Sequence, residues 1–102
     1  MDDLDICRRI AKIEGLRVSK DVKPKGGSVY ANIYPNDCYG NYNPLTDNAL
    51  CFQLMIKYKL SLIAPEGEQT NWDCIIIDIL TCDENPNKAI CLAIIELKKK
   101  GK

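Results

Sequence analysis

Residues 43–63 read NPLTDNALCFQLMIKYKLSLI, and this stretch predicts a helix that leads directly into a strand. Asn43 is a favourable N-cap, and Pro44 suits the first helical position, where its missing N–H costs nothing. We therefore expect a helix over residues 43–58. Its apolar face is formed by Leu50, Cys51, Leu54, Met55 and Tyr58, which recur at helical spacing.

Two strands are expected after this helix. Residues 60–64 form a short apolar run that ends at a Pro-Glu-Gly turn. Residues 72–79 are rich in isoleucine, a β-branched residue that suits a buried pleated surface. Because the connection is short, the two strands are predicted to pair as an antiparallel hairpin. Residues 81–84 are polar and are predicted to form a turn.

Two further helices complete the expected fold. Asn85-Pro86 repeats the Asn-Pro start signal, and the helix that follows is apolar on most of its circumference, so it is expected to be central to the core. It ends in a lysine-rich tail at about residues 99–102, which we expect to be mobile. The first helix spans residues 2–14, is capped by Asp2 or Asp3, and is stopped by Gly15.

The predicted fold is one α+β domain over residues 1–102. Its element order is α-(β)-α-β-β-α, and about three helices pack on one face of a small antiparallel sheet. A chain of 102 residues is long enough to bury a single core without the help of disulfides or metal ions.

Residues 29–42 hold four of the five tyrosines, interleaved with asparagine, proline and glycine. Residues 29–33 alternate in polarity, which predicts a strand, and Pro35-Asn36-Asp37 consists of residues that favour a turn. Such a composition also builds protein-binding surfaces at low entropic cost. The alternative is that the rings pack across the edge of the core with their hydroxyls at the surface. The candidate protein-binding residues are Tyr30, Asn32, Tyr34, Asn36, Tyr39 and Tyr42.

Residues 16–28 are basic and poor in apolar groups, which predicts a loop with at most a short strand near residues 16–18. A solvated connection explains this composition, and a nucleic-acid or nucleotide-binding module is the alternative. The net charge opposes that alternative, because 14 Lys and Arg balance 14 Asp and Glu. The candidate nucleic-acid-binding residues are Arg17, Lys20, Lys23 and Lys25.

The composition argues against catalysis and metal binding. The chain has no histidine, which removes the commonest general base and metal ligand. Its six cysteines lack the close pairs of a zinc site, and four of them, Cys7, Cys51, Cys74 and Cys91, lie in apolar segments. No run is apolar enough to span a membrane, and no basic leader precedes the first helix. We expect a reduced cytoplasmic protein without cofactor, metal or enzymatic activity.

Short motifs spread over nearly the whole chain resemble a known family. They are the opening Asp3-Leu4-Asp5-Ile6, Tyr42-Asn43-Pro44 before Asp47-Asn48-Ala49, the lone Trp72, and Asn85-Pro86 with Lys88-Ala89. Together they resemble the NinX-like family of small accessory proteins of tailed bacteriophages. The family often has Asp-Ala-Trp-Pro where this chain has Asn48-Ala49-Leu50-Cys51, a departure that indicates a distant branch.

The resemblance implies a phage or prophage origin and action in the cytoplasm of the host bacterium. It carries over no catalytic residues. By analogy with small neutral phage proteins, the expected function is non-enzymatic binding of a host or bacterial-defence protein, for example as an anti-CRISPR. The oligomeric state stays open between a monomer and a homodimer.

Overall fold

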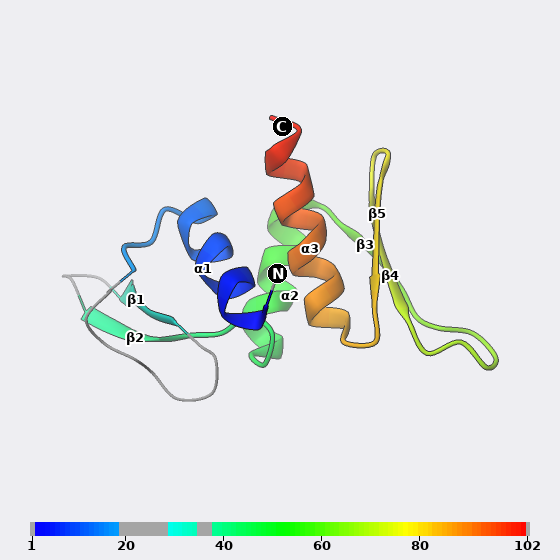
Figure 1. Cartoon of the computed structure of the whole chain (residues 1–102), viewed down its shortest axis with the longest axis horizontal. Helices are drawn as coiled ribbons and strands as arrows, with labels where there is room; N and C mark the ends of the chain where they lie inside the picture. The colour runs from blue at the N-terminus through cyan, green and yellow to red at the C-terminus, as the bar shows by residue number, and fades with distance from the viewer. Residues whose placement is uncertain (1, 19–28, 35–37, 102) are drawn as a thin grey trace. The chain divides into compact units, whose positions relative to one another are not determined.

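The computed structural model describes residues 2–18, 29–34 and 38–101. The strands form two antiparallel sheets, one of two strands and one of three (Figure 1). The predicted α+β fold, with three helices and a small antiparallel sheet, is confirmed. In chain order the elements are α1 (Asp3–Ile13), β1 (Val29–Tyr34), β2 (Cys38–Tyr42), α2 (Asn48–Tyr58), β3 (Ser61–Ile63), β4 (Trp72–Ile76), β5 (Ile79–Asp83) and α3 (Pro86–Lys99).

The chain divides into two compact units, residues 1–43 and residues 44–102. The first contains α1 and the sheet β1–β2, and the second contains α2, α3 and the sheet β3–β4–β5. The organisation as one domain stays a prediction.

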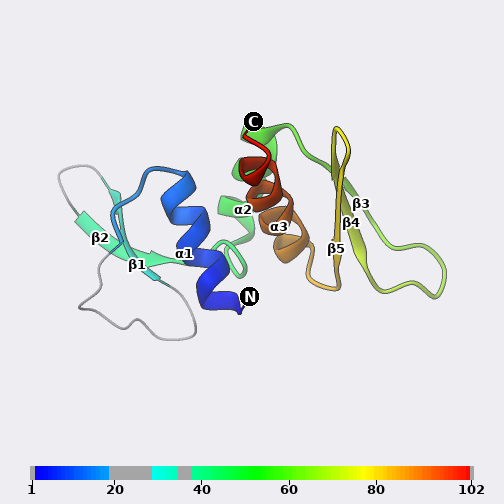
Figure 2. The same ribbon diagram turned by 45° about the horizontal axis from the view of Figure 1, so that its top comes forward.

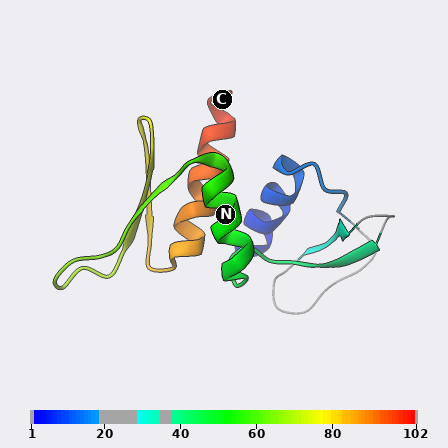
Figure 3. The same cartoon turned by 180° about the vertical axis from the view of Figure 1, so that it is seen from behind.

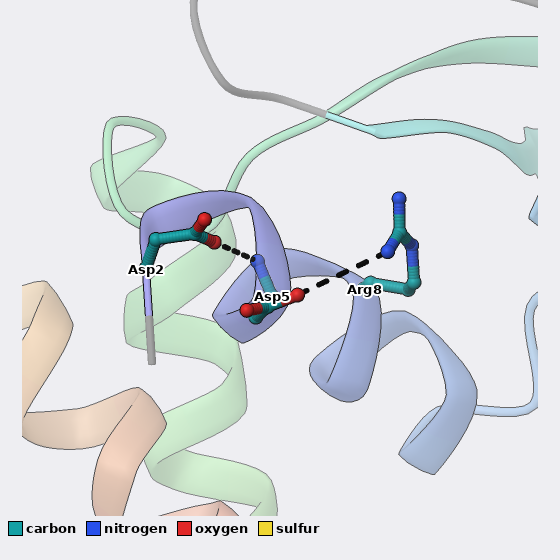
Figure 4. A network of polar contacts seen from close by, with 3 residues as sticks. All are labelled: Asp2, Asp5 and Arg8. Atoms are coloured by element: carbon teal, nitrogen blue, oxygen red, sulfur yellow. Dashed lines mark hydrogen bonds and ion pairs between the residues drawn. The ribbon is translucent and has the colours of Figure 1, made fainter.

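Helix α1 begins as its sequence predicts. The Asp2 carboxylate accepts a hydrogen bond from the backbone N–H of Asp5 at 2.8 Å, which satisfies a donor at the helix start (Figure 4). Arg8 lies 3.9 Å from the Asp5 carboxylate, an exposed ion pair of little energetic weight (Figure 4). Gly15 has φ +76°, the left-handed conformation expected of a helix stop. The buried face of α1 is Ile6, Cys7, Ile10 and Ala11.

The two-stranded sheet lies next to α1 in the chain and in space, since α1 contacts β1. Its register pairs Val29 with Tyr42 and Ala31 with Gly40, and Val29, Ala31 and Tyr42 are buried. The strand expected at residues 29–33 is confirmed. The second strand, β2, falls where only loop and turn chemistry was expected, because its glycine, asparagine and tyrosines gave little strand signal. The predicted turn at residues 35–37 lies outside the described residues.

Helix α2 starts later than predicted. Its N-cap is Asp47, whose carboxylate accepts the N–H of Leu50 at 3.1 Å, so the prediction of a start at Asn43-Pro44 was wrong. Residues 44–46 form a turn instead. Asn43 has another role, because its side-chain oxygen accepts a hydrogen bond from the Cys7 thiol at 3.3 Å. A capping signal is local, and here a second capping residue close downstream starts the helix.

The predicted strand at residues 72–79 is two strands. The chain reverses at Ile77-Asp78, and β5 occupies all but Glu84 of the segment that was predicted to be a polar turn at residues 81–84. The error arose because a continuous isoleucine run hides a two-residue turn that contains neither glycine nor asparagine. The predicted antiparallel pairing of residues 60–64 with the strand that begins at Trp72 is confirmed: β3 pairs with β4, with Leu62 opposite Cys74. Figure 3 shows β3 leaving the end of α2 and entering this sheet.

Helix α3 is the centre of the second unit, as predicted. It begins at Pro86 with Asn85 as its N-cap, and it packs on β4 and β5 and against α2 (Figures 1 and 2). It extends through Lys99, so it includes the start of the expected tail. Its buried residues are Asn87, Ala89, Ile90, Cys91, Ala93, Ile94, Ile95 and Leu97.

Asn87 joins the start of α3 to the segment that precedes α2. Its side-chain amide donates to the Leu45 carbonyl at 3.1 Å and to the Asn48 side-chain oxygen at 2.8 Å. Asn85 donates to the same Leu45 carbonyl at 3.4 Å and accepts the N–H of Asn87 at 2.9 Å. The two amides therefore tie the beginnings of the two helices together through the Leu45 carbonyl.

Replacing Asn87 by Ala should lower the free energy of unfolding by about 2–3 kcal/mol, because a buried carbonyl and a side-chain oxygen lose a donor. Urea denaturation measures the change. The control is Asn71→Ala, at an exposed loop position, which should change stability by less than about 0.5 kcal/mol. Equal effects of the two substitutions would contradict the role of Asn87.

Candidate functional site

The three-stranded sheet has one covered face and one open face. Cys74 pairs with Thr81, and the Thr81 hydroxyl donates to the Ala89 carbonyl of α3 at 2.6 Å, so these two residues lie on the face that α3 covers. Side chains alternate between faces along a strand. The neighbours of Cys74 and Thr81 in each strand therefore point to the opposite side. Among residues 44–101 no helix packs on that side (Figure 1).

The open face is unusually apolar for a face exposed to water. An antiparallel sheet packed on one side usually alternates apolar and polar residues, with the polar ones outward. Here Ile63 is 45% exposed and Leu80 is 63% exposed. Asp73 is the charged residue of the open face, and it pairs with Ile63 of β3 on one side and Cys82 of β5 on the other. The register assigns to the open face Ser61, Ile63, Asp73, Ile75, Leu80 and Cys82.

The hairpin between β4 and β5 has a strained apolar residue at its tip. Ile77 has φ +56° and is 68% exposed. A β-branched residue is a genuine outlier in this region, which glycine occupies without penalty. Strain of this kind often marks functional positions. Ile77 is therefore a second apolar feature of the sheet that folding alone does not explain.

The tyrosine-rich candidates lie on the β1–β2 hairpin. The backbone register pairs Tyr30 with Asn41 and Asn32 with Tyr39, and Tyr34 pairs with Cys38. At these tyrosines and at Asn32 the structure describes the backbone, and Asn36 lies outside the described residues.

Tyr42 is the exception, and it corrects the predicted set. Its side chain is only 4% exposed, because its position opposite Val29 places it on the buried face of the hairpin. The register puts Tyr30, Asn32 and Tyr39 at the alternate positions, together with Asn41, whose side chain is exposed. Tyr42 is thus a core residue, while the role of the others stays a prediction.

Of the four basic candidates, the described part of the chain contains one. Arg17 is exposed, and Lys20, Lys23 and Lys25 lie outside the described residues. At the end of α3, Lys98 lies 5.7 Å from the centre of the Tyr58 ring. Lys99 pairs with Glu96 at 3.3 Å and Lys100 pairs with Asp78 at 3.2 Å.

Three cysteine thiols lie close together inside the second unit, and each is fully buried. They belong to Cys51 of α2, Cys74 of β4 and Cys91 of α3. A hydrogen bond from the Cys91 thiol lowers the pKa of Cys51, against the opposing effects of burial and of Asp47. Burial, followed by the nearby Cys51, raises the pKa of Cys74 from its ordinary 9.0 to about 11. Because no solvent reaches these sulfurs, they act as small apolar core residues. Over residues 2–18, 29–34 and 38–101, no group of three or more potential ligands could hold a metal.

Comparisons with protein-family models, with curated proteins and with solved structures found no match for this chain. The resemblance to the NinX-like family therefore stays a prediction. In the described part of the chain, no helix has the length and apolar character to cross a membrane.

The sequence interpretation missed the residues that form the open face. Ile63 and Ile77 were assigned to strands and Leu80 to neither a strand nor a turn, and none of the three was assigned to an exposed surface. The missing information was the reversal at Ile77. If residues 72–79 formed one strand, Leu80 would follow its end, whereas in the hairpin Leu80 lies opposite Ile75 on the open face. The sequence signal for this reversal was Asp78 itself, which separates a four-residue apolar run from a second apolar run at residues 79–80.

The buried Cys74 thiol predicts a loss of stability at alkaline pH. Its pKa is near 11 in the folded chain and near 9 once unfolded, so the unfolded state releases this proton first. Stability should therefore fall as the pH rises from 9 to 11, with a contribution of roughly 1.4 kcal/mol per pH unit from this group.

The measurement is the free energy of unfolding of the wild type and of Cys74→Ala at pH 8, 9, 10 and about 11. The variant starts less stable because of the cavity, but it should have the shallower slope. Parallel slopes for the two proteins would show that Cys74 does not titrate as its burial requires.

Proposed function

We propose that the protein is a non-enzymatic binding module that docks another protein on the open face of the β3–β4–β5 sheet. The observation that carries this proposal is the exposure of Ile63, Ile77 and Leu80 on and beside one sheet face. Several exposed apolar groups on one sheet face indicate an interaction site, whereas single scattered ones need no explanation. The partner that fits presents an apolar surface, with a lysine or arginine to meet Asp73.

The strain at Ile77 supports the same surface. A glycine at this turn would remove the steric penalty of the positive φ, yet the chain holds a large apolar side chain there, pointing into solvent. An apolar anchor projecting from a hairpin tip can fill a pocket on a partner, and such buried anchors supply most of the binding energy of an interface. The cost to folding is then offset in the complex.

The chain is proposed to be a phage-encoded accessory protein that acts in the host cytoplasm and binds a host or bacterial-defence protein, with anti-CRISPR activity as one form. The motifs that resemble the NinX-like family support this. The tyrosine-rich hairpin, through Tyr30, Asn32, Tyr34, Asn36 and Tyr39, is a second proposed contact.

A nucleic-acid function is less favoured by the described residues. The lysines at the end of α3 lie against Tyr58, Glu96 and Asp78, so carboxylates neutralise part of their charge. A phosphate-binding surface requires uncompensated cations that share one face. Catalysis by cysteine is opposed by the burial of Cys51, Cys74 and Cys91.

The test is capture of the tagged chain from bacterial lysate with and without nuclease, identification of the stoichiometric protein, and titration of that purified partner. Leu80→Lys should weaken its binding about ten-fold or more, because it places a charge in the apolar interface. The control is Phe52→Lys, at another exposed apolar residue, on α2, which should bind as the wild type does.

Ile77→Gly separates folding from binding. It should raise the free energy of unfolding by about 1 kcal/mol through relief of the positive φ, while it weakens binding. Wild-type affinity in both Leu80→Lys and Ile77→Gly would refute the proposed surface. Recovery of nucleic acid alone, lost on nuclease treatment, would favour the alternative function.

A further inference from the structure

Strand β5 ends the three-stranded sheet, whose order is β3-β4-β5. Ile76 and Ile79 flank the two-residue turn, and such a flanking pair is hydrogen-bonded. Hydrogen-bonded and non-hydrogen-bonded pairs alternate along an antiparallel ladder, so the backbone of Thr81 bonds to that of Cys74. The backbone N–H and C=O groups of Leu80 and Cys82 then point away from β4. An edge of this kind is a template for another strand.

A groove of about 480 Å³ runs between this edge and α3. Thr81 lines this groove, and its hydroxyl donates a hydrogen bond to the Ala89 carbonyl of α3 at 2.6 Å. At one end, Lys100 pairs with Asp78 at 3.2 Å. A strand added to β5 would therefore also meet a side of α3. The groove is lined by Asp78, Ile79, Leu80, Thr81, Cys82, Leu92, Glu96 and Lys100.

Leu92 and Glu96 of α3 line the groove, and Lys88 lies one helical turn before Leu92 on the same side of the helix, which gives that side a self-complementary charge pattern. Lys88, Leu92 and Glu96 recur every four residues and are half-buried, while residues 89–91, 93–95 and 97 are buried. These three residues share one face of the helix. If a second α3 is laid antiparallel with the two copies of Leu92 in contact, each Lys88 faces a Glu96 of the other copy.

The strand has a matching centre. An antiparallel pairing of two β5 strands about Thr81 sets Leu80 of one copy against Cys82 of the other, so that their outward N–H and C=O groups bond to each other. The Thr81–Ala89 hydrogen bond places this centre within about one helical turn of Leu92. A single two-fold axis can therefore relate both the two β5 strands and the two α3 helices.

We propose that two copies of the chain associate through β5 and α3 about this axis and form one continuous six-stranded sheet. The occupant of the groove is thus the second copy, a choice that rests on the Lys88–Leu92–Glu96 pattern. In the pair, Leu80 and Cys82 of both copies adjoin on the open face and extend its apolar surface across the interface. Self-association does not depend on the proposed host partner, so either proposal can fail alone.

The test is sedimentation velocity of the purified full chain over a series of concentrations. The wild type should show a concentration-dependent monomer–dimer equilibrium. Lys88→Glu and Glu96→Lys should each weaken dimerisation about ten-fold or more, because each variant places like charges opposite each other twice. The double variant Lys88→Glu/Glu96→Lys restores opposite charges and should dimerise within about three-fold of the wild type.

A matched control is Lys12→Glu, an equal charge change at an exposed position of α1, which should leave the dissociation constant unchanged. Circular dichroism of each variant checks that the helices remain. A wild type that stays monomeric at every concentration would overturn the proposal, as would a dimer that the single variants do not weaken or that the double variant does not restore. Protection of the Leu80 and Cys82 amides only after a different protein is added would assign the groove to that protein instead.

Discussion

The second unit depends on one polar contact at the start of its central helix. The Asn87 amide bonds to the Leu45 carbonyl and to the Asn48 side chain, and this fixes where α3 begins relative to α2. From that point α3 extends with most of its circumference buried and packs on β4 and β5. Because α3 covers only one face of the sheet, the other face of the three strands stays uncovered by any described helix of this unit, and that face is the proposed docking surface.

Much of this arrangement was predictable from local signals. Asp2, Gly15 and Asn85 act at helix ends as their chemistry predicts, and the apolar periodicity of residues 86–97 identified the central helix. The errors came from signals that compete over a few residues. Asn43-Pro44 looks like a helix start, but Asp47 caps the helix and Asn43 accepts a hydrogen bond from Cys7, a partner thirty-six residues away that no local pattern reveals.

The candidate site was less predictable than the fold for a related reason. Which face of a strand is covered depends on register, and register depends on turns. The turn at Ile77-Asp78 lacks the usual glycine or asparagine, so the covered Cys74 and the open-face Leu80 could not be assigned to opposite sides from sequence. Tyr42 illustrates the same limit, since only its pairing with Val29 shows that this tyrosine belongs to the core.

The central claim is that the sheet has one sealed face and one open face, and native thiol labelling tests it most directly. Cys82 is exposed on the open face, whereas Cys74, in the neighbouring strand, is buried beneath α3. Brief treatment of the folded chain with a maleimide, read by peptide mass spectrometry, should modify Cys82 and leave Cys74 intact until the chain is unfolded. Equal modification of Cys74 and Cys82 under native conditions would contradict the account.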